Sequence, residues 1–128
     1  MSSTEGGGGN RVRWWRALFY TSVVTAVVVA CLPGFPAPTQ LLSDKALHFG
    51  AFVFLTVLAV LAFPKVWRGV ILIGLSMLGL AIEMLQATTW INRTPEALDL
   101  VADVLAIGLT LLFIEACRDF GGRLRRTG

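Results

Sequence analysis

Apolar residues gather in four stretches of the chain, and polar or helix-breaking residues separate one stretch from the next. The stretches cover residues 17–32, 46–63, 70–85 and 98–114. A helix that crosses a bilayer needs about 20 mostly apolar residues, and tryptophans beside the first stretch bring it to that length. Prolines follow the first two stretches, at Pro33 and Pro64, and a proline cannot continue a helix. The pattern predicts an all-α fold, an integral membrane four-helix bundle.

The composition agrees with a chain that lies largely in a membrane. Hydrophobic residues make up 55% of its 128 residues and charged residues only 15%, too few to cover the surface of a soluble protein. We expect three parts: a Ser/Gly-rich disordered cytoplasmic tail over 1–10, a four-helix transmembrane domain over 11–118 and a basic cytoplasmic tail over 119–128. The net charge of +3 comes from arginines beside the apolar stretches, which is typical of membrane topology signals and not of nucleic-acid binding.

Basic residues predict the orientation. Nine of the eleven Lys and Arg lie in the N-terminal segment, the turn around residue 65 and the C-terminal segment; only Lys45 and Arg93 lie elsewhere. Because basic residues favour the cytoplasmic side, we expect both termini in the cytoplasm and the two long loops at the outer face of the cytoplasmic membrane. Cys31 and Cys117 would then lie on opposite faces, so no disulfide between them is expected. An alternative for the first stretch is a cleaved signal peptide that ends near Cys31.

Most of the remaining ionisable residues fall at one expected depth, close to the outer face. With one glutamine they form a candidate polar cluster: Asp44, Lys45, His48, Glu83, Gln86, Arg93, Asp99 and Asp103. Residues three or four apart share a helix face, as Asp44 and His48 do. An ionised side chain costs about 2.5–3.5 kcal/mol at the centre of a bilayer. We therefore expect these side chains to face one another or a wet cavity, with Lys45 and Arg93 as the partners of the carboxylates.

The cluster is compatible with more than one kind of site. Ion pairs and hydrogen bonds that only hold four short helices together are one interpretation. A metal site is another, because carboxylates and histidine are suitable ligands; no spacing matches a metal motif, however, and no metal is predicted. The chain has no motif of a serine hydrolase, a P-loop protein or a zincin, and no cofactor is expected.

Four parts of the cluster have a distinctive spacing. They are Asp44-Lys45-Ala46-Leu47-His48-Phe49, Glu83-Met84-Leu85-Gln86, Arg93 and Asp99-Leu100-Val101-Ala102-Asp103. This set resembles the VanZ-like family of small bacterial membrane proteins, whose motifs are Asp-Lys-x-x-His-Phe, Glu-x-x-Gln, a loop Arg and Asp-x-x-Ala-Asn. The resemblance covers about residues 17–114. Two positions differ: Asp103 stands where the family usually has Asn, and Ala106 stands where Gly is common.

The resemblance implies a role in the cell envelope. The family's namesake is an accessory protein in resistance to the glycopeptide teicoplanin, by a mechanism that is not established. From the resemblance and the outer-face position of the cluster, we expect a site for the headgroup of a lipid-linked or cell-wall precursor. The expected partners are the lipid bilayer and such precursors, and the sequence does not indicate an oligomeric state.

Two other functions stay open. In an intramembrane acid/base enzyme, Glu83 or Asp99 would be the general base and His48 the acid. A basic residue of the cluster would then steady an anionic group, although no nucleophile motif supports catalysis. In a structural or assembly protein, small residues of the third stretch would form a helix-packing face. These residues are Gly74, Ser76 and Gly79.

Overall fold

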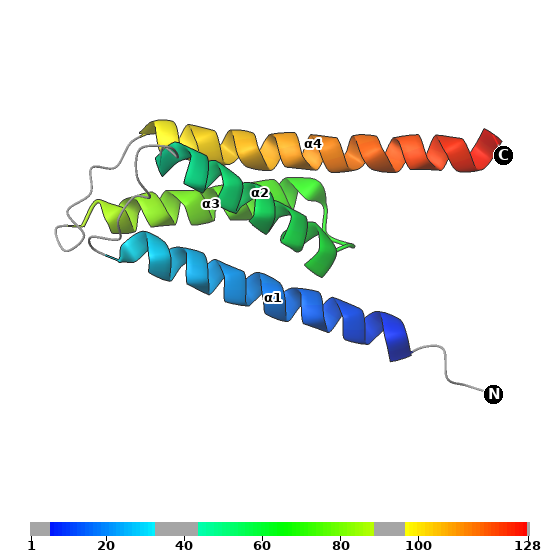
Figure 1. Ribbon diagram of the computed structural model, residues 1–128, viewed down its shortest axis with the longest axis horizontal. Coiled ribbons are helices and arrows are strands. Elements are labelled where there is room, and N and C mark those ends of the chain that lie inside the picture. Colours follow the sequence, from blue (N-terminus) through cyan, green and yellow to red (C-terminus); the bar gives the residue numbers. More distant parts are fainter. Residues whose placement is uncertain (1–5, 33–43, 89–96, 128) are drawn as a thin grey trace.

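The computed structural model describes residues 6–32, 44–88 and 97–127, which form four α-helices. They are α1 (Gly6–Cys31), α2 (Asp44–Ala62), α3 (Arg68–Gln86) and α4 (Ala97–Thr127). The predicted all-α fold with four helices is confirmed. Successive helices run in opposite directions (Figure 1), so α1 and α3 end where α2 and α4 begin. We call this the site end, and we call the opposite end, where α1 begins and α4 ends, the termini end.

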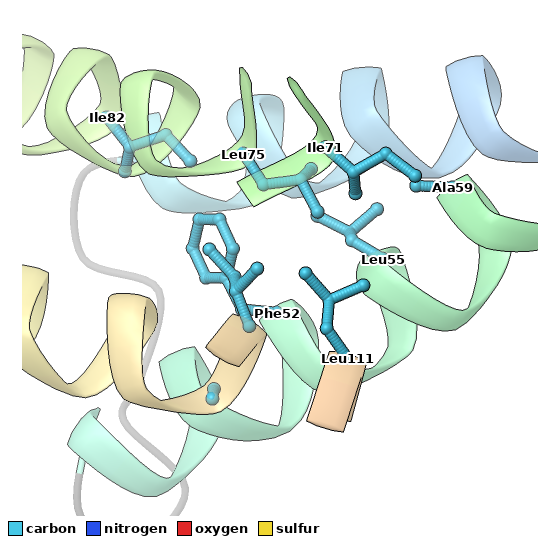
Figure 2. Close-up of a cluster of buried hydrophobic side chains, with 9 residues drawn as sticks. Phe52, Leu55, Ala59, Ile71, Leu75, Ile82 and Leu111 are labelled. Atoms are coloured by element: carbon cyan, nitrogen blue, oxygen red, sulfur yellow. The ribbon is translucent and has the colours of Figure 1, made fainter. Parts of the chain in front are cut away.

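Helix α2 lies in the middle of the bundle and packs against each of the other three helices. Helix α3 also packs against α1 and α4, whereas α1 and α4 do not pack on each other within the described residues. A core of buried apolar side chains lies between α2, α3 and α4 (Figure 2). Its members are Phe52, Leu55, Ala59, Ile71, Leu75, Ile82, Ala106, Ile107 and Leu111. Within each helix most of them are one or two turns apart, the spacing that places side chains on one face.

Helix α1 packs on this core from outside. None of its described side chains is buried, and one stripe of partly buried residues contacts the core. The stripe consists of Phe19, Val23, Ala26, Val27 and Ala30. These positions recur every three or four residues, so they lie on a single helix face. The rest of the α1 surface is open, and α1 is the most peripheral helix of the bundle.

Three helices are long and apolar enough to cross a membrane. The segments are Gly8–Cys31 in α1, Arg68–Gln86 in α3 and Ala97–Arg126 in α4. The apolar part of α2, Ala46–Ala62, is shorter. Large apolar side chains are exposed on the outside of the helices, among them Phe54, Ile73 and Phe113, as expected for side chains that face lipid. By helix length and hydropathy, this is a multi-pass membrane protein.

Close packing of α3 on α4 depends on one of the three small residues predicted to form a packing face. A Cβ atom at Gly79 would lie 3.0 Å from Oδ2 of Asp103 and 3.4 Å from Cζ of Phe52. At Gly74 a Cβ atom would meet nothing within 4 Å. Gly79 is therefore a close-approach position within the bundle, whereas Gly74 lines an open groove. A packing role for Gly74 against another chain stays a prediction.

The ends of two helices differ from the predicted boundaries. Helix α1 begins at Gly6, so residues 6–10 of the predicted disordered tail are helical, and the rest of that tail lies outside the described residues. Glycine disfavours a helix, but Gly8 and Gly9 lie beside the α2–α3 turn and line a hollow with it. The hollow shared with that turn gives this part of α1 a tertiary environment that its composition alone does not predict.

Helix α4 continues to Thr127, through most of the segment 119–128 that was predicted as a tail. No proline interrupts it. Arg118 donates a hydrogen bond to Glu115 one turn earlier, at 3.3 Å, and two arginines lie in the last turn. Pairs at this spacing and basic groups near the C-terminal end both stabilise a helix.

Candidate functional site

Asp103 of α4 is the centre of the polar site, with a side chain only 1% exposed. Its Oδ1 lies 3.6 Å from Nδ1 of His48 on α2, close enough for an ion pair but longer than a hydrogen bond. Neither carboxylate oxygen accepts a hydrogen bond from any described residue. A buried carboxylate is unfavourable unless an opposite charge lies close. The imidazole of His48 supplies such a charge when it is protonated.

The sequence places this pair as a continuation of the apolar core. His48 is four residues before Phe52 and shares its face of α2. Asp103 is four residues before Ile107 and shares its face of α4. Since Phe52 and Ile107 are both core residues, the polar pair occupies the next turn of each helix toward the site end. The same helix rotation that buries the core therefore also buries the pair.

A second polar level lies nearer the site end. Gly79 and Asp103 face each other, and α3 and α4 run in opposite directions (Figure 1). The residue four positions after Gly79 on α3 and the residue four positions before Asp103 on α4 therefore lie at the same height. This height is about 6 Å along the helices from the level of Asp103. The residues at this level are Glu83 and Asp99, which are 7% and 9% exposed. Two buried carboxylates thus lie at matching heights on adjacent helices.

Gln86 connects the site end of α3 to α1. It is 4% exposed, and its Nε2 donates a hydrogen bond to the carbonyl oxygen of Ala30, at 3.1 Å. Helix α1 ends at Cys31, and the last four carbonyls of a helix have no partner within it. Gln86 therefore caps the end of α1. The sequence offered no signal for this contact, because the acceptor is a backbone atom.

The remaining predicted site residues lie at or beyond the edge of the described structure. Helix α2 begins at Asp44 and Lys45, one turn before His48 and hence at the site end. Their side chains and the whole of Arg93 lie outside the described residues. The predicted pairing of the carboxylates with Lys45 and Arg93 stays a prediction. Among the described residues, no three His, Cys, Asp or Glu side chains are arranged to hold a metal ion.

Two contacts at the termini end were missed by the sequence analysis, which treated their arginines only as topology signals. Arg16 of α1 donates from Nε to the carbonyl of Ala62 at 3.2 Å, and its guanidinium lies 5.3 Å from the ring centre of Phe63. Arg68 of α3 donates from Nε to Glu115 of α4 at 2.8 Å. Ala62 is the last residue of α2, and the last carbonyls of a helix need partners from outside it, but no residue type in the sequence identifies Arg16 as that partner.

The fold and this cluster define a class of protein: a small multi-pass helical membrane protein with ionisable side chains buried at one end of its bundle. Comparisons with protein families, curated proteins and solved structures found no match.

Proposed function

We propose that this chain is a VanZ-like protein of the cell envelope whose polar site binds the headgroup of a lipid-linked cell-wall precursor. The contact between His48 and Asp103 carries the proposal. It joins residues of α2 and α4 in the bundle interior, beside the second level formed by α3 and α4. Ionisable side chains inside a membrane bundle are costly to insert, and they commonly mark the path or site of a ligand or ion.

The proposal includes a topology in which α2 is a fourth membrane-crossing helix. With 19 residues, α2 is about 28 Å long, close to the roughly 30 Å of a bilayer core. Nine of the eleven Lys and Arg belong to segments at the termini end, which favours a cytoplasmic position for that end. The site end then lies at the outer face of the cytoplasmic membrane, where a lipid-linked precursor headgroup is accessible.

The side chains of the site suit a large polar headgroup. Carboxylates such as Glu83 and Asp99 accept hydrogen bonds from hydroxyl, amide and ammonium groups, which sugars and peptides carry. Lys45 and Arg93 would supply positive charge to the phosphates that link the headgroup to its lipid. The VanZ-like resemblance adds the expected association with resistance to teicoplanin-type glycopeptides.

A deletion strain tests this function in the cell. We expect deletion to change susceptibility to envelope-targeting antibiotics, including teicoplanin, and the wild-type chain to restore it. Glu83→Gln, which keeps the shape of the side chain but removes its charge, should fail to restore it at wild-type abundance. Asp119→Asn, an exposed charge change on α4, is the matched control and should restore it. Full restoration by Glu83→Gln would refute this assignment of the site.

The contact between His48 and Asp103 also favours a second candidate, an intramembrane acid/base enzyme acting on envelope lipids. A histidine beside a buried carboxylate is an arrangement that general acid/base catalysis uses, and such contacts often shorten when substrate binds. The purified protein would then turn over a phosphate-containing envelope lipid, and His48→Gln would abolish turnover without abolishing binding. Binding without turnover by the wild-type protein would exclude this candidate and leave the binding function in place.

A further inference from the structure

A basic hollow and an apolar groove adjoin at the termini end, away from the polar site. The hollow has a volume of about 450 Å³ and lies between the start of α1 and the α2–α3 turn. Its basic lining residues are Arg13, Arg16 and Lys65. The groove has a volume of about 430 Å³ and lies between α1, α2 and α3. Phe63 and Val66 line both, so the two form one continuous surface.

The groove is almost entirely apolar. Phe19, Tyr20 and Val23 of α1 form one wall, and residues of α2 and α3 form the other. Its floor is open at Gly74, where a Cβ atom would meet nothing within 4 Å. A groove of this kind on a membrane helix bundle suits a hydrocarbon chain, which makes dispersion contacts and needs no hydrogen-bond partner.

The hollow has the opposite chemistry. Arg13 and Arg16 are three residues apart and share a face of α1, and Lys65 stands across from them in the α2–α3 turn. Phe63 lies at the boundary between the hollow and the groove. Its ring centre is 5.5 Å from that of Phe19 on the groove side and 5.3 Å from the guanidinium carbon of Arg16 on the hollow side. The positively charged surface and the apolar surface are thus separated by only about one side chain, that of Phe63.

The surrounding aromatic residues fix the depth of this surface. Trp14 and Trp67 are 72% and 74% exposed and stand near the basic hollow along the chain. Tryptophans of membrane helices concentrate at the level of the lipid headgroups. The hollow is therefore at headgroup depth, and the groove lies below it at acyl-chain depth.

We propose that the start of α1 and the α2–α3 turn bind one anionic phospholipid, with its phosphate in the basic hollow and an acyl chain in the groove. Basic pockets between membrane helices are the usual sites for anionic headgroups. Charge and depth together select this occupant: a zwitterionic lipid lacks the net charge, and a free phosphate does not use the groove. The site is separate from the polar cluster and does not depend on the function proposed for it.

Lipid retention by the purified protein tests this site. The probe is phosphatidylglycerol, compared by native mass spectrometry and thermal unfolding with phosphatidylcholine of the same chains and with soluble glycerol 3-phosphate. We expect the wild-type protein to retain one phosphatidylglycerol and to be stabilised by it. Arg13→Gln combined with Lys65→Gln should weaken retention by about 25-fold, since each of the two basic groups near an anionic membrane surface contributes about fivefold. These variants leave Arg16, which also caps α2, unchanged.

Three comparisons make the result specific. The pair Arg123→Gln and Arg125→Gln removes the same charge from α4, which does not pack on α1 within the described residues, and should leave retention unchanged. Gly74→Leu fills the groove and should weaken retention without any change of charge. The charge-preserving pair Arg13→Lys and Lys65→Arg should keep it. Equal retention of phosphatidylcholine, equal losses in both charge-removed pairs, or full competition by glycerol 3-phosphate would overturn the proposal.

Discussion

Gly79 of α3 faces Asp103 of α4 so closely that a Cβ atom on the glycine would lie 3.0 Å from the carboxylate oxygen Oδ2. The same atom would lie 3.4 Å from Cζ of Phe52. Gly79 therefore sets the distance between α3 and the centre of the polar site. An added side chain at this position must displace a buried carboxylate, a core ring or the helix itself.

We expect Gly79→Leu to destabilise the bundle by about 1–3 kcal/mol, the usual cost of overpacking an interior. Gly74→Ala is the control, because its Cβ atom enters open space and alanine favours a helix over glycine by about 1 kcal/mol. The measurement is reversible unfolding of the purified protein in mixed micelles, followed by circular dichroism. Equal effects at the two positions would contradict the close approach of α3 and α4.

His48 and Asp103 should behave as a coupled pair. His48→Leu leaves a buried carboxylate without its nearby positive charge, and we expect a loss of about 3 kcal/mol in the free energy of unfolding. Asp103→Asn removes the charge but no hydrogen bond, so it should be nearly neutral. In the double variant, Asp103→Asn should recover most of the loss caused by His48→Leu. A double-mutant cycle measures this coupling, and additive effects would show that the two side chains do not interact.

Gln86→Leu should loosen the end of α1. The substitution removes the hydrogen bond to the Ala30 carbonyl, a contact expected to contribute about 1 kcal/mol. Cys31 follows Ala30 and is half-buried, whereas Cys117 is exposed near the other end of the bundle. We expect a maleimide to label Cys31 several-fold faster in the variant and Cys117 at an unchanged rate. An unchanged Cys31 rate would show that Gln86 does not hold α1.

The proposed topology predicts the behaviour of reporters fused to the C-terminus in a bacterial host. Green fluorescent protein placed after Gly128 should fluoresce, and alkaline phosphatase at the same position should be inactive, because that end is expected in the cytoplasm. Four crossings also require the N-terminus on the same side, which an N-terminal epitope tag tests by its resistance to external protease. Active phosphatase after Gly128 would reverse the orientation and move the polar site to the cytoplasmic face.

The sequence predicts features that depend on one helix at a time. Apolar length located all four helices, and helical spacing placed Glu83 with Gln86, and Asp99 with Asp103, on common faces. Contacts between helices were harder to predict from the sequence, because they depend on how each helix is rotated and tilted against its neighbours. Helical spacing placed His48 with Asp44, whose side chain lies outside the described residues, but it could not predict the contact of His48 with Asp103 on another helix.

Contacts from side chains to backbone atoms could not be predicted from the sequence, for a related reason. The Gln86 side chain ends on the carbonyl of Ala30 and the Arg16 side chain on that of Ala62, and no residue type identifies such an acceptor. The end of α4 was also misplaced, since hydropathy falls after residue 114 while the helix continues to Thr127. Apolar length predicts where a helix crosses a membrane, and it does not predict how far the helix extends into water.

Direct binding of a lipid-linked cell-wall precursor to the protein in nanodiscs tests the central claim. We expect saturable binding by the wild-type protein, and at least tenfold weaker binding by Glu83→Gln at an unchanged midpoint of thermal unfolding. The control Asp119→Asn should bind as the wild type does. Equal affinity of all three proteins, or no saturable binding by the wild type, would contradict a precursor site at this end of the bundle.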